Sequence, residues 1–416
     1  MRPVPPTTGS GSDPEPRLPG TARALIALRG ARSLGQGAFF VDLALYLAHL
    51  GWSGTQIGLV LTGGGLFTGA LSLGVGFSSD RLTRKPFIVA NECLTFAAAV
   101  TAFLAQTPWL LAIPIVLAGF GRGANGSAGP FAAAEQAWLA HLIPPKRRGR
   151  IFSLNTATGF FGMGAGALIA IFPGVAGLGL LGYRLLFILP MASSLFNLTV
   201  LSFLREVRPP PQAPAPVHHV RAQRRKENRN LTRLVLLNSV NGFAVGLIGP
   251  LMSYWLAVRF GVGPAAIAPV MGLAFAVTGV SSLVTGRLTE RLGLVRSVVS
   301  LRSLGLILLA ILPLMPTYAL AALVYFIRSA LNRGSVGARQ AVVMSLVGDE
   351  RRGWATSLNA TSFQFPQAIG PVLAGTLIEQ GDLILPFYLA FVLQLVYVVG
   401  YWRLFRHLES GPAPAP

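Results

Sequence analysis

Charged side chains stand inside several long apolar stretches of this sequence. Asp42 lies in the apolar run 29–50, and helical spacing places Gly35, Tyr46 and His49 on the same face of a helix. A charged group in hydrocarbon is costly, so such a residue indicates a functional role by default. Desolvation favours the protonated carboxyl, and Asp42 is therefore predicted to bind a proton or a substrate. The alternative is a static ion pair that fixes this helix.

A second group of charges lies in the apolar run 317–340. Arg328, Asn332 and Arg339 fall on one side of a helix over this run, and Arg333 is close to them in sequence. A stripe of arginines that faced lipid would be prohibitively costly, so it is expected to face a central cavity or its mouth. One interpretation is that these arginines bind an anionic part of a substrate. The other is that Arg339 forms a gate with Glu135, and the sequence leaves both open.

Uncharged polar side chains in the apolar runs are further candidates for the lining of a cavity. They are Tyr46, Asn125, Asn238, Asn241, Gln364 and Gln367. Hydrogen bonding between helices is the commoner use of such residues and is the alternative. The histidines are scattered along the chain and Cys93 is the single cysteine, so no metal site is predicted. Because no nucleophile stands with a base, the sequence predicts neither an enzyme nor a cofactor.

Long apolar helices must carry these residues. The chain of 416 residues is 52% hydrophobic and only 12% charged, with a mean hydropathy of +0.60, whereas soluble proteins carry about 25% charged residues. A helix needs about 20 apolar residues to cross a bilayer. Twelve runs approach that length: 29–50, 55–77, 86–105, 109–135, 151–172, 184–204, 231–258, 265–285, 297–315, 317–340, 353–379 and 385–405. The predicted fold is an all-α membrane protein with twelve transmembrane helices.

Basic residues concentrate on every second connection between these spans. The basic connections contain Arg81, Lys146, the segment 205–233, Arg287 and Arg351. The opposite connections hold only Arg184 and Arg259. Cytoplasmic loops carry the excess of Lys and Arg, so both termini are predicted to face the cytoplasm. The net charge of +20 is then a mark of membrane topology, and no nucleic-acid partner is predicted.

The two halves of the sequence repeat. Arg147-Arg148-Gly149 followed by Ser153-Leu154-Asn155 recurs as Arg351-Arg352-Gly353 followed by Ser357-Leu358-Asn359. Such a repeat predicts two pseudo-symmetric six-helix bundles. The predicted division is a disordered cytoplasmic tail 1–22, a bundle 23–204, a linker 205–230, a bundle 231–405 and a cytoplasmic tail 406–416. The Pro-rich and basic linker is expected to be a solvated connection, with a site for a partner or anionic lipid as the alternative.

The connection after the second span has a specific order of glycine, acid and bases. It runs Gly76, Asp80, Arg81, Thr83, Arg84 and Lys85. This loop resembles the signature loop of the major facilitator superfamily, with Thr83 in place of the family's second glycine. Gly286, Glu290 and Arg291 repeat its beginning in the second half. The resemblance covers residues 23–405 and implies that both the fold and the loop's role are those of this family.

In that family the loop carboxylate closes the cytoplasmic side by meeting the positive N-terminal end of span eleven. The resemblance therefore implies a latch at Asp80, and at Glu290 by pseudo-symmetry. Glu135 and Arg339 are expected to approach each other when that side closes. Arg122 resembles the family's span-four arginine, which is associated with proton coupling, although the usual glutamine is absent. It is expected to pair with Asp42 across the first bundle.

The resemblance implies secondary transport of a small solute by alternating access. We expect proton-coupled export through Asp42 and Arg122, by a monomer in the cell membrane, with the bacterial inner membrane as its place. A proton-coupled uptake symporter for a sugar or an organic anion is the first alternative. A membrane sensor or scaffold without transport is the second. The expected partners are the solute, protons and the lipid bilayer.

Overall fold

The computed structural model describes residues 18–79, 83–121, 129, 132–144, 147–206, 221–347 and 352–409. These described residues form helices and short connections, with no strand among them. The helices of the first half are α1 (Gly20–His49), α2 (Gly54–Ser79), α3 (Lys85–Leu104), α4 (Pro108–Ala118), α5 (Ala132–His141), α6 (Arg148–Ile169), α7 (Phe172–Val175), α8 (Leu180–Leu185) and α9 (Ile188–Phe203). The helices of the second half are α10 (Arg221–Ile248), α11 (Met252–Phe260), α12 (Pro264–Leu292), α13 (Leu294–Ile311), η2 (Leu312–Leu314), α14 (Tyr318–Gly334), α15 (Val336–Ser345), α16 (Arg352–Glu379), α17 (Leu385–Phe405) and η4 (Arg406–Glu409).

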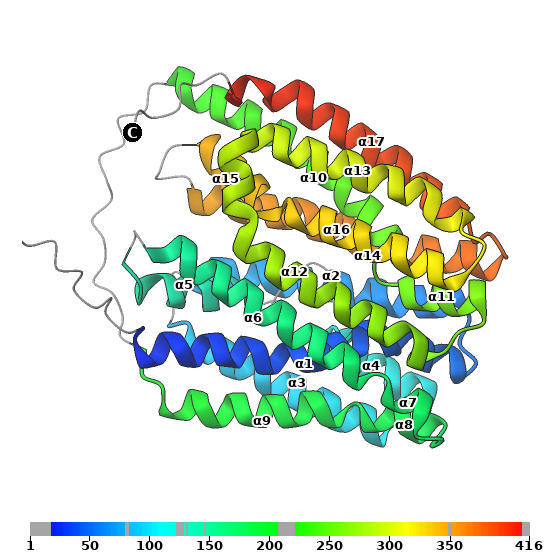
Figure 1. Cartoon of the computed structure of the whole chain (residues 1–416). Helices are drawn as coiled ribbons and strands as arrows, with labels where there is room; N and C mark the ends of the chain where they lie inside the picture. Colours follow the sequence, from blue (N-terminus) through cyan, green and yellow to red (C-terminus); the bar gives the residue numbers. More distant parts are fainter. Residues whose placement is uncertain are drawn as a thin grey trace, which may run out of the picture.

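The helices form two bundles that lie against each other (Figure 1). In the first bundle α1 packs along α6, and α3 packs along α9. In the second bundle α10 packs along α16 and α17. The bundles meet where α2 lies against α16 and where α6 lies against α12, so each half contributes equivalent helices to the interface. The predicted all-α fold in two pseudo-symmetric halves is confirmed.

Two close backbone approaches make the equivalence of the halves visible at single residues. A Cβ atom added to Gly37 of α1 would lie 2.0 Å from the carbonyl oxygen of Met163 in α6. A Cβ atom added to Gly246 of α10 would lie 2.2 Å from the carbonyl oxygen of Gln367 in α16. Only glycine lets helices approach so closely. Gly37 and Gly246 therefore occupy equivalent places in α1 and α10.

The outward faces of the helices are apolar, as expected for a chain that lies in lipid. Large apolar side chains are exposed along α9, α13, α14 and α17, among them Leu195, Ile307, Leu323 and Val392. Eight segments of the described chain are long and apolar enough to cross a membrane. They correspond to the predicted spans two, three, five to nine and twelve.

The remaining predicted spans depart from a single apolar helix. The first and eleventh correspond to α1 and α16, with 30 and 28 residues. The fourth and tenth are each shared between two helices, α4 with α5 and α14 with α15. The count of twelve spans therefore stays a prediction. α10 also begins at Arg221, inside the segment predicted as a linker.

The two bundles share a hydrophobic core only at one end of the molecule. The first turn of α1 and the last turn of α17 lie at the same end (left in Figure 1), which we call the terminal face. Toward the opposite face a single core cluster joins residues of both bundles, and Phe40 of α1 packs edge-on against Phe275 of α12 with ring centroids 5.3 Å apart. Toward the terminal face each bundle has its own cluster. The structure is therefore closed at the opposite face.

Polar contacts between α2 and α16 reinforce this closure. The N–H group of Thr55 donates to the Glu379 carboxylate at 2.9 Å, and the Thr55 hydroxyl donates to that of Thr376 at 3.1 Å. The carboxylate thus caps the first turn of α2, where the helix dipole favours negative charge. One turn further, a Cβ atom on Gly58 would lie 2.4 Å from the carbonyl oxygen of Pro371.

We expect the Gly58→Leu substitution to open the opposite face, because a side chain at this position has no room while α2 and α16 are in contact. The measurement is the distance between spin labels at Gln106→Cys and Gln380→Cys, both exposed at that face, in a Cys93→Ser background. The longer distance should gain population. Gly74→Leu in the same helix is the matched control, because its added Cβ atom meets nothing within 4 Å among the described residues. Equal distance distributions for the two variants would contradict the packing argument.

Candidate functional site

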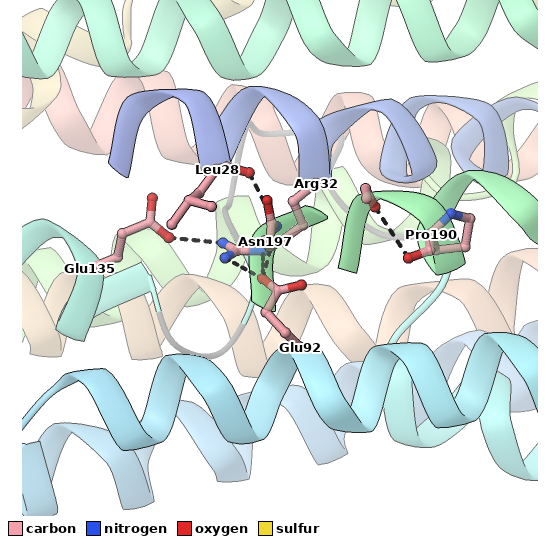
Figure 2. A network of polar contacts seen from close by, with 7 residues as sticks. Leu28, Arg32, Glu92, Glu135, Pro190 and Asn197 are labelled. Carbon is pink, nitrogen blue, oxygen red and sulfur yellow. Dashed lines mark hydrogen bonds and ion pairs between the residues drawn. The ribbon is translucent and has the colours of Figure 1, made fainter. Parts of the chain in front are cut away.

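A buried network of charges holds the first bundle together on its terminal side. Arg32 of α1 points between Glu92 of α3 and Glu135 of α5 (Figure 2). Its Nε atom donates to Glu92 at 2.8 Å, and its Nη1 atom donates to Glu135 at 2.8 Å. Asn197 of α9 donates to the same Glu92 oxygen at 3.1 Å. One guanidinium group therefore connects three helices, and Asn197 adds a fourth helix, α9, to the network.

The charges of this network balance. Glu92 is fully buried, and Glu135 is 2% exposed. Arg29, one turn before Arg32, is also buried and interacts electrostatically with Glu135. Two arginines thus face two carboxylates. Buried ions are tolerated only when they are paired with good geometry, and this arrangement meets that condition.

Asp42 lies further along α1, toward the opposite face, in very different surroundings. It is 1% exposed, and neither carboxylate oxygen has a hydrogen-bond partner among the described residues. Tyr46, one turn later, accepts a hydrogen bond from Arg184 at 3.2 Å and stacks on Tyr183. Tyr46 is therefore used inside the first bundle. An ionised carboxylate without a partner is expensive to bury, so Asp42 can be accommodated here when it carries a proton.

The second bundle contains a cavity of about 220 Å³. It is lined by residues of α10, α11, α13, α14, α15, α16 and α17, and among the described lining residues Phe40 of α1 comes from the first bundle. Four arginines reach it, namely Arg302, Arg328, Arg333 and Arg339. Amide and aromatic side chains complete the wall, including Asn238, Asn332, Asn359, Gln340, Gln364, Tyr325, Phe363, Tyr397 and Tyr401. No acidic residue stands among these lining residues.

Neutral groups position two of the four arginines. Arg302 donates to Asn241 at 3.3 Å and to the Ser335 hydroxyl at 3.2 Å, and it lies over the Tyr397 ring. Arg333 lies over the Phe275 ring with its guanidinium carbon 4.7 Å from the centroid, as in a cation–π contact. These contacts orient the cations without neutralising them.

The other two arginines each have a hydrogen-bond donor that no described residue accepts. The Nε atoms of Arg328 and Arg339 are buried and find no hydrogen-bond partner among the described residues. Arg328 as a whole is 8% exposed. Buried donors without partners are rare in proteins and need an explanation, such as a missing ligand.

The polar residues predicted to line a cavity fall into two groups. Asn238, Arg328, Asn332, Arg333 and Gln364 line the cavity described above, together with Arg339, which was predicted as a gate residue or an anion-binding residue. Asn241 is fully buried and holds Arg302 in place. Tyr46 belongs to the first bundle, and Gln367 supplies the carbonyl group beside Gly246. Arg122 and Asn125 lie outside the described residues, so their roles stay predictions.

Arg339 does not lie on one continuous helix with Arg328, as the sequence had predicted. α14 ends at Gly334 and α15 begins at Val336. The Ser335 hydroxyl between them donates to the carbonyl group of Asn332 at 2.8 Å and so competes with the backbone ladder. The break still leaves both arginines on the cavity.

The predicted latch loop is described only in part. Gly76 lies near the end of α2, and Glu290 and Arg291 lie in the last turn of α12, while Asp80 and Arg81 are outside the described residues. Arg84 and Lys85 contact their own bundle: the Arg84 guanidinium meets His141 at 2.9 Å, and Lys85 donates to the Leu204 carbonyl group at 2.7 Å. Glu135 pairs with Arg32 within the first bundle, and Arg339 lines the cavity of the second bundle.

Sequence reasoning missed Arg32, Glu92 and Arg302. Each is a charged residue inside a predicted span, namely 29–50, 86–105 or 297–315. The signal that singled out Asp42 therefore applied equally to these three residues.

Comparisons with known proteins agree with the two-bundle architecture. The sequence profile of the Major Facilitator Superfamily matches residues 25–233 and 234–416. The multidrug resistance protein MdtH of Cronobacter sakazakii is 35% identical over 145 residues, which are 35% of this chain and 31% of that protein. MdtH of Escherichia coli K12 is 31% identical over 142 residues, 32% of each chain. The match therefore spans about a third of the length of these relatives.

Solved transporter structures share the fold. A bacterial homolog of the human lysosomal transporter Spinster, in an inward-facing and unoccupied conformation, superposes with a TM-score of 0.75 at 16% identity and covers 97% of this chain and 100% of that chain. A D-xylose–proton symporter gives 0.72 at 13% identity, covering 92% and 97%. The human organic anion transporter MFSD10 gives 0.66 at 15% identity, covering 92% and 100%. At these identities the likeness concerns the fold alone.

We expect Arg32→Gln to destabilise the protein strongly, because it leaves Glu92 and Glu135 buried without their common partner. Breaking a buried ion pair on one side costs about 3–5 kcal/mol. The measurement is the melting temperature of the purified protein in detergent. Adding Glu92→Gln and Glu135→Gln to the same protein should restore most of the loss. Arg403→Gln, at an exposed position near the end of α17, is the control. An unchanged melting temperature for Arg32→Gln would show that the network is not needed for the bundle.

Proposed function

Because the chain belongs to the Major Facilitator Superfamily, we propose that it exports a small solute across a membrane in exchange for protons. Members of this family are transporters and not enzymes, and their two bundles expose a central site to one side of the membrane at a time. The direction of transport and the use of protons are the parts that we propose.

The observation that carries the proposal is the unpartnered carboxylate of Asp42. Both oxygens lack a hydrogen-bond partner among the described residues, and the neighbouring Val41 and Leu43 belong to the core that joins the bundles. In this closed arrangement the neutral, protonated acid is the form that fits. When the bundles part at the opposite face, water reaches this region and the acid takes up a proton. Exchange requires that this proton is released toward the terminal face after the opposite face has closed.

The proton and the solute then favour different conformations. A protonated Asp42 stabilises the conformation that is closed at the opposite face. A bound solute, in contrast, stabilises the polar cavity of the second bundle through contacts with its arginines. Each ligand can shift the equilibrium only through its different affinity for the two states. An exchanger needs this division, because the proton drives one half of the cycle and the solute drives the other.

Two further observations support export. The curated relatives that match over a third of the chain carry the name multidrug resistance protein. Basic residues concentrate at the terminal face, at Arg84, Lys85, Arg147, Arg148 and Arg403, and this favours a cytoplasmic location of that face. The inner membrane of a bacterium is the proposed place.

We expect Asp42→Asn to abolish transport driven by a pH gradient while exchange of solute for solute continues, because asparagine is always neutral. The solute is first chosen by a thermal-shift screen against cationic, anionic and sugar compounds, since a ligand stabilises the state that it binds. The chosen compound is then followed in inverted membrane vesicles that respiration acidifies inside. Accumulation that an uncoupler abolishes is the expected result for the unmodified protein.

The matched control is Asp382→Asn, the same substitution at an exposed position of the opposite face. It should leave accumulation unchanged. Normal gradient-driven accumulation by Asp42→Asn would contradict the role of Asp42. Release of compound from the vesicles on acidification would show transport toward the cytoplasm and would contradict export.

A further inference from the structure

Three positions of the charge network in the first bundle have counterparts in the second. Arg32 precedes Gly37 by as many residues as Asn241 precedes Gly246, and these glycines make equivalent helix contacts. The number of residues from Gly76 to Glu92 equals the number from Gly286 to Arg302. In the third pair, the number from Glu135 to Arg147 equals the number from Arg339 to Arg351.

The contacts agree with this correspondence, but the charges are reversed. In the first bundle the arginine of α1 donates to two carboxylates. In the second bundle the equivalent residue of α10 is Asn241, which accepts a hydrogen bond from Arg302. Where the first bundle has two acids, the second has Arg302 and Arg339. Arg328 and Arg333 of α14 add two more cations to the same cavity.

Among the described residues that line the cavity, none is an acid. The acidic residues of the described helices of this bundle are Glu227, Glu290, Glu379 and Glu409, each within about two turns of a helix end. Neither Glu227 nor Glu379 lines the cavity. Buried charges require a partner or remain costly, and arginine is suited to bidentate contacts with carboxylate, sulfonate and phosphate groups.

Glu135 is not available to neutralise Arg339 in this conformation. Its carboxylate is bonded to Arg32 of its own bundle. If it moved to Arg339, Arg32 would keep only Glu92, and the balance in the first bundle would be lost. The described residues that line the cavity therefore supply no compensating charge.

We propose that this cavity binds a small organic anion, whose acidic group supplies the negative charge that Glu92 and Glu135 supply in the first bundle. The free Nε donors of Arg328 and Arg339 are the expected contacts of that group. Phe40, Phe363 and Tyr325 provide an aromatic wall for its apolar part. The volume of about 220 Å³ lies below the usual range of about 300–1,000 Å³ for ligand pockets, so the ligand is small. This assignment rests on the proposed function in taking the anion as the exported solute.

The test compares three compounds that share one apolar body and differ in charge. They are naphthalene-1-sulfonate, 1-naphthylmethylammonium and 1-naphthol, titrated onto the purified full-length protein in detergent and followed by calorimetry. The sulfonate is expected to bind, and the cation is not. Sodium chloride at the same ionic strength serves as the inorganic probe. Equal binding of the cation, or displacement of the sulfonate by equimolar chloride, would overturn the proposal.

Arg328→Gln tests the site itself. Loss of a charge-assisted hydrogen bond should weaken sulfonate binding about ten- to hundredfold. The same substitution removes an uncompensated buried cation, so the ligand-free protein should melt at an equal or higher temperature. Arg403→Gln, at an exposed position, should change neither quantity. Unchanged affinity in Arg328→Gln, or a lower melting temperature without ligand, would show that this arginine is structural and would overturn the assignment.

The binding measurement needs no pH gradient, so it separates this proposal from the proposed function. Asp382→Asn, at an exposed position of the opposite face, should bind the sulfonate as the unmodified protein does. Binding without gradient-driven transport would contradict proton-coupled export and leave the anion site standing. Gradient-driven transport of a cation or a neutral compound, with no sulfonate binding, would contradict the anion site alone.

Discussion

A charge inside a membrane protein has to be compensated, and this constraint organises the interior of the molecule. In the first bundle the guanidinium group of Arg32 bridges Glu92 and Glu135 and so connects α1, α3 and α5. In lipid the hydrophobic effect does not drive helices together as it does in water. Close packing and polar contacts therefore hold such helices together. The network therefore acts as a polar core for the half of the first bundle in which the two bundles do not share apolar contacts.

Glycine contacts place the equivalent residues of the two bundles in register. Gly37 lets α1 approach α6, and Gly246 lets α10 approach α16 in the same way. Residues one and a half turns earlier, Arg32 and Asn241, then occupy equivalent positions. Asn241 accepts a hydrogen bond from Arg302 of α13, and Arg302 lines the cavity together with the arginines of α14 and α15. One backbone arrangement thus yields a filled ionic network in one bundle and an open cationic cavity in the other.

The fold was accessible from the sequence because its signals are long and redundant. Apolar run length, the alternation of basic connections and the repeat of Arg147-Arg148-Gly149 all indicate the same architecture. The arginines of the run 317–340 also indicated a cavity. The charge network could not be predicted from the sequence. Arg32, Glu92 and Glu135 are distant in the sequence, and a single sequence holds no signal that they are in contact. The break at Ser335 was missed for another reason: an interruption of one residue between two helices leaves the apolar pattern of the run unchanged.

The reversed charges of the two bundles bear on how the proposed exchange of a solute for protons would be driven. By Coulomb's law an anion in the cavity would attract a proton to Asp42 rather than repel it, so direct repulsion between the two ligands cannot produce exchange. Exchange can arise instead because the proton and the anion stabilise different conformations. A protonated Asp42 fits the apolar core that closes the opposite face, and an anion that neutralises the arginines lowers the free-energy cost of closing the terminal face over them.

Phe40 connects the two regions. It lines the cavity and packs on Phe275, and it lies only two residues before Asp42 on α1. Separation of the bundles at the opposite face must move Phe40 away from Phe275, and this would change the cavity wall and admit water toward Asp42 in the same step.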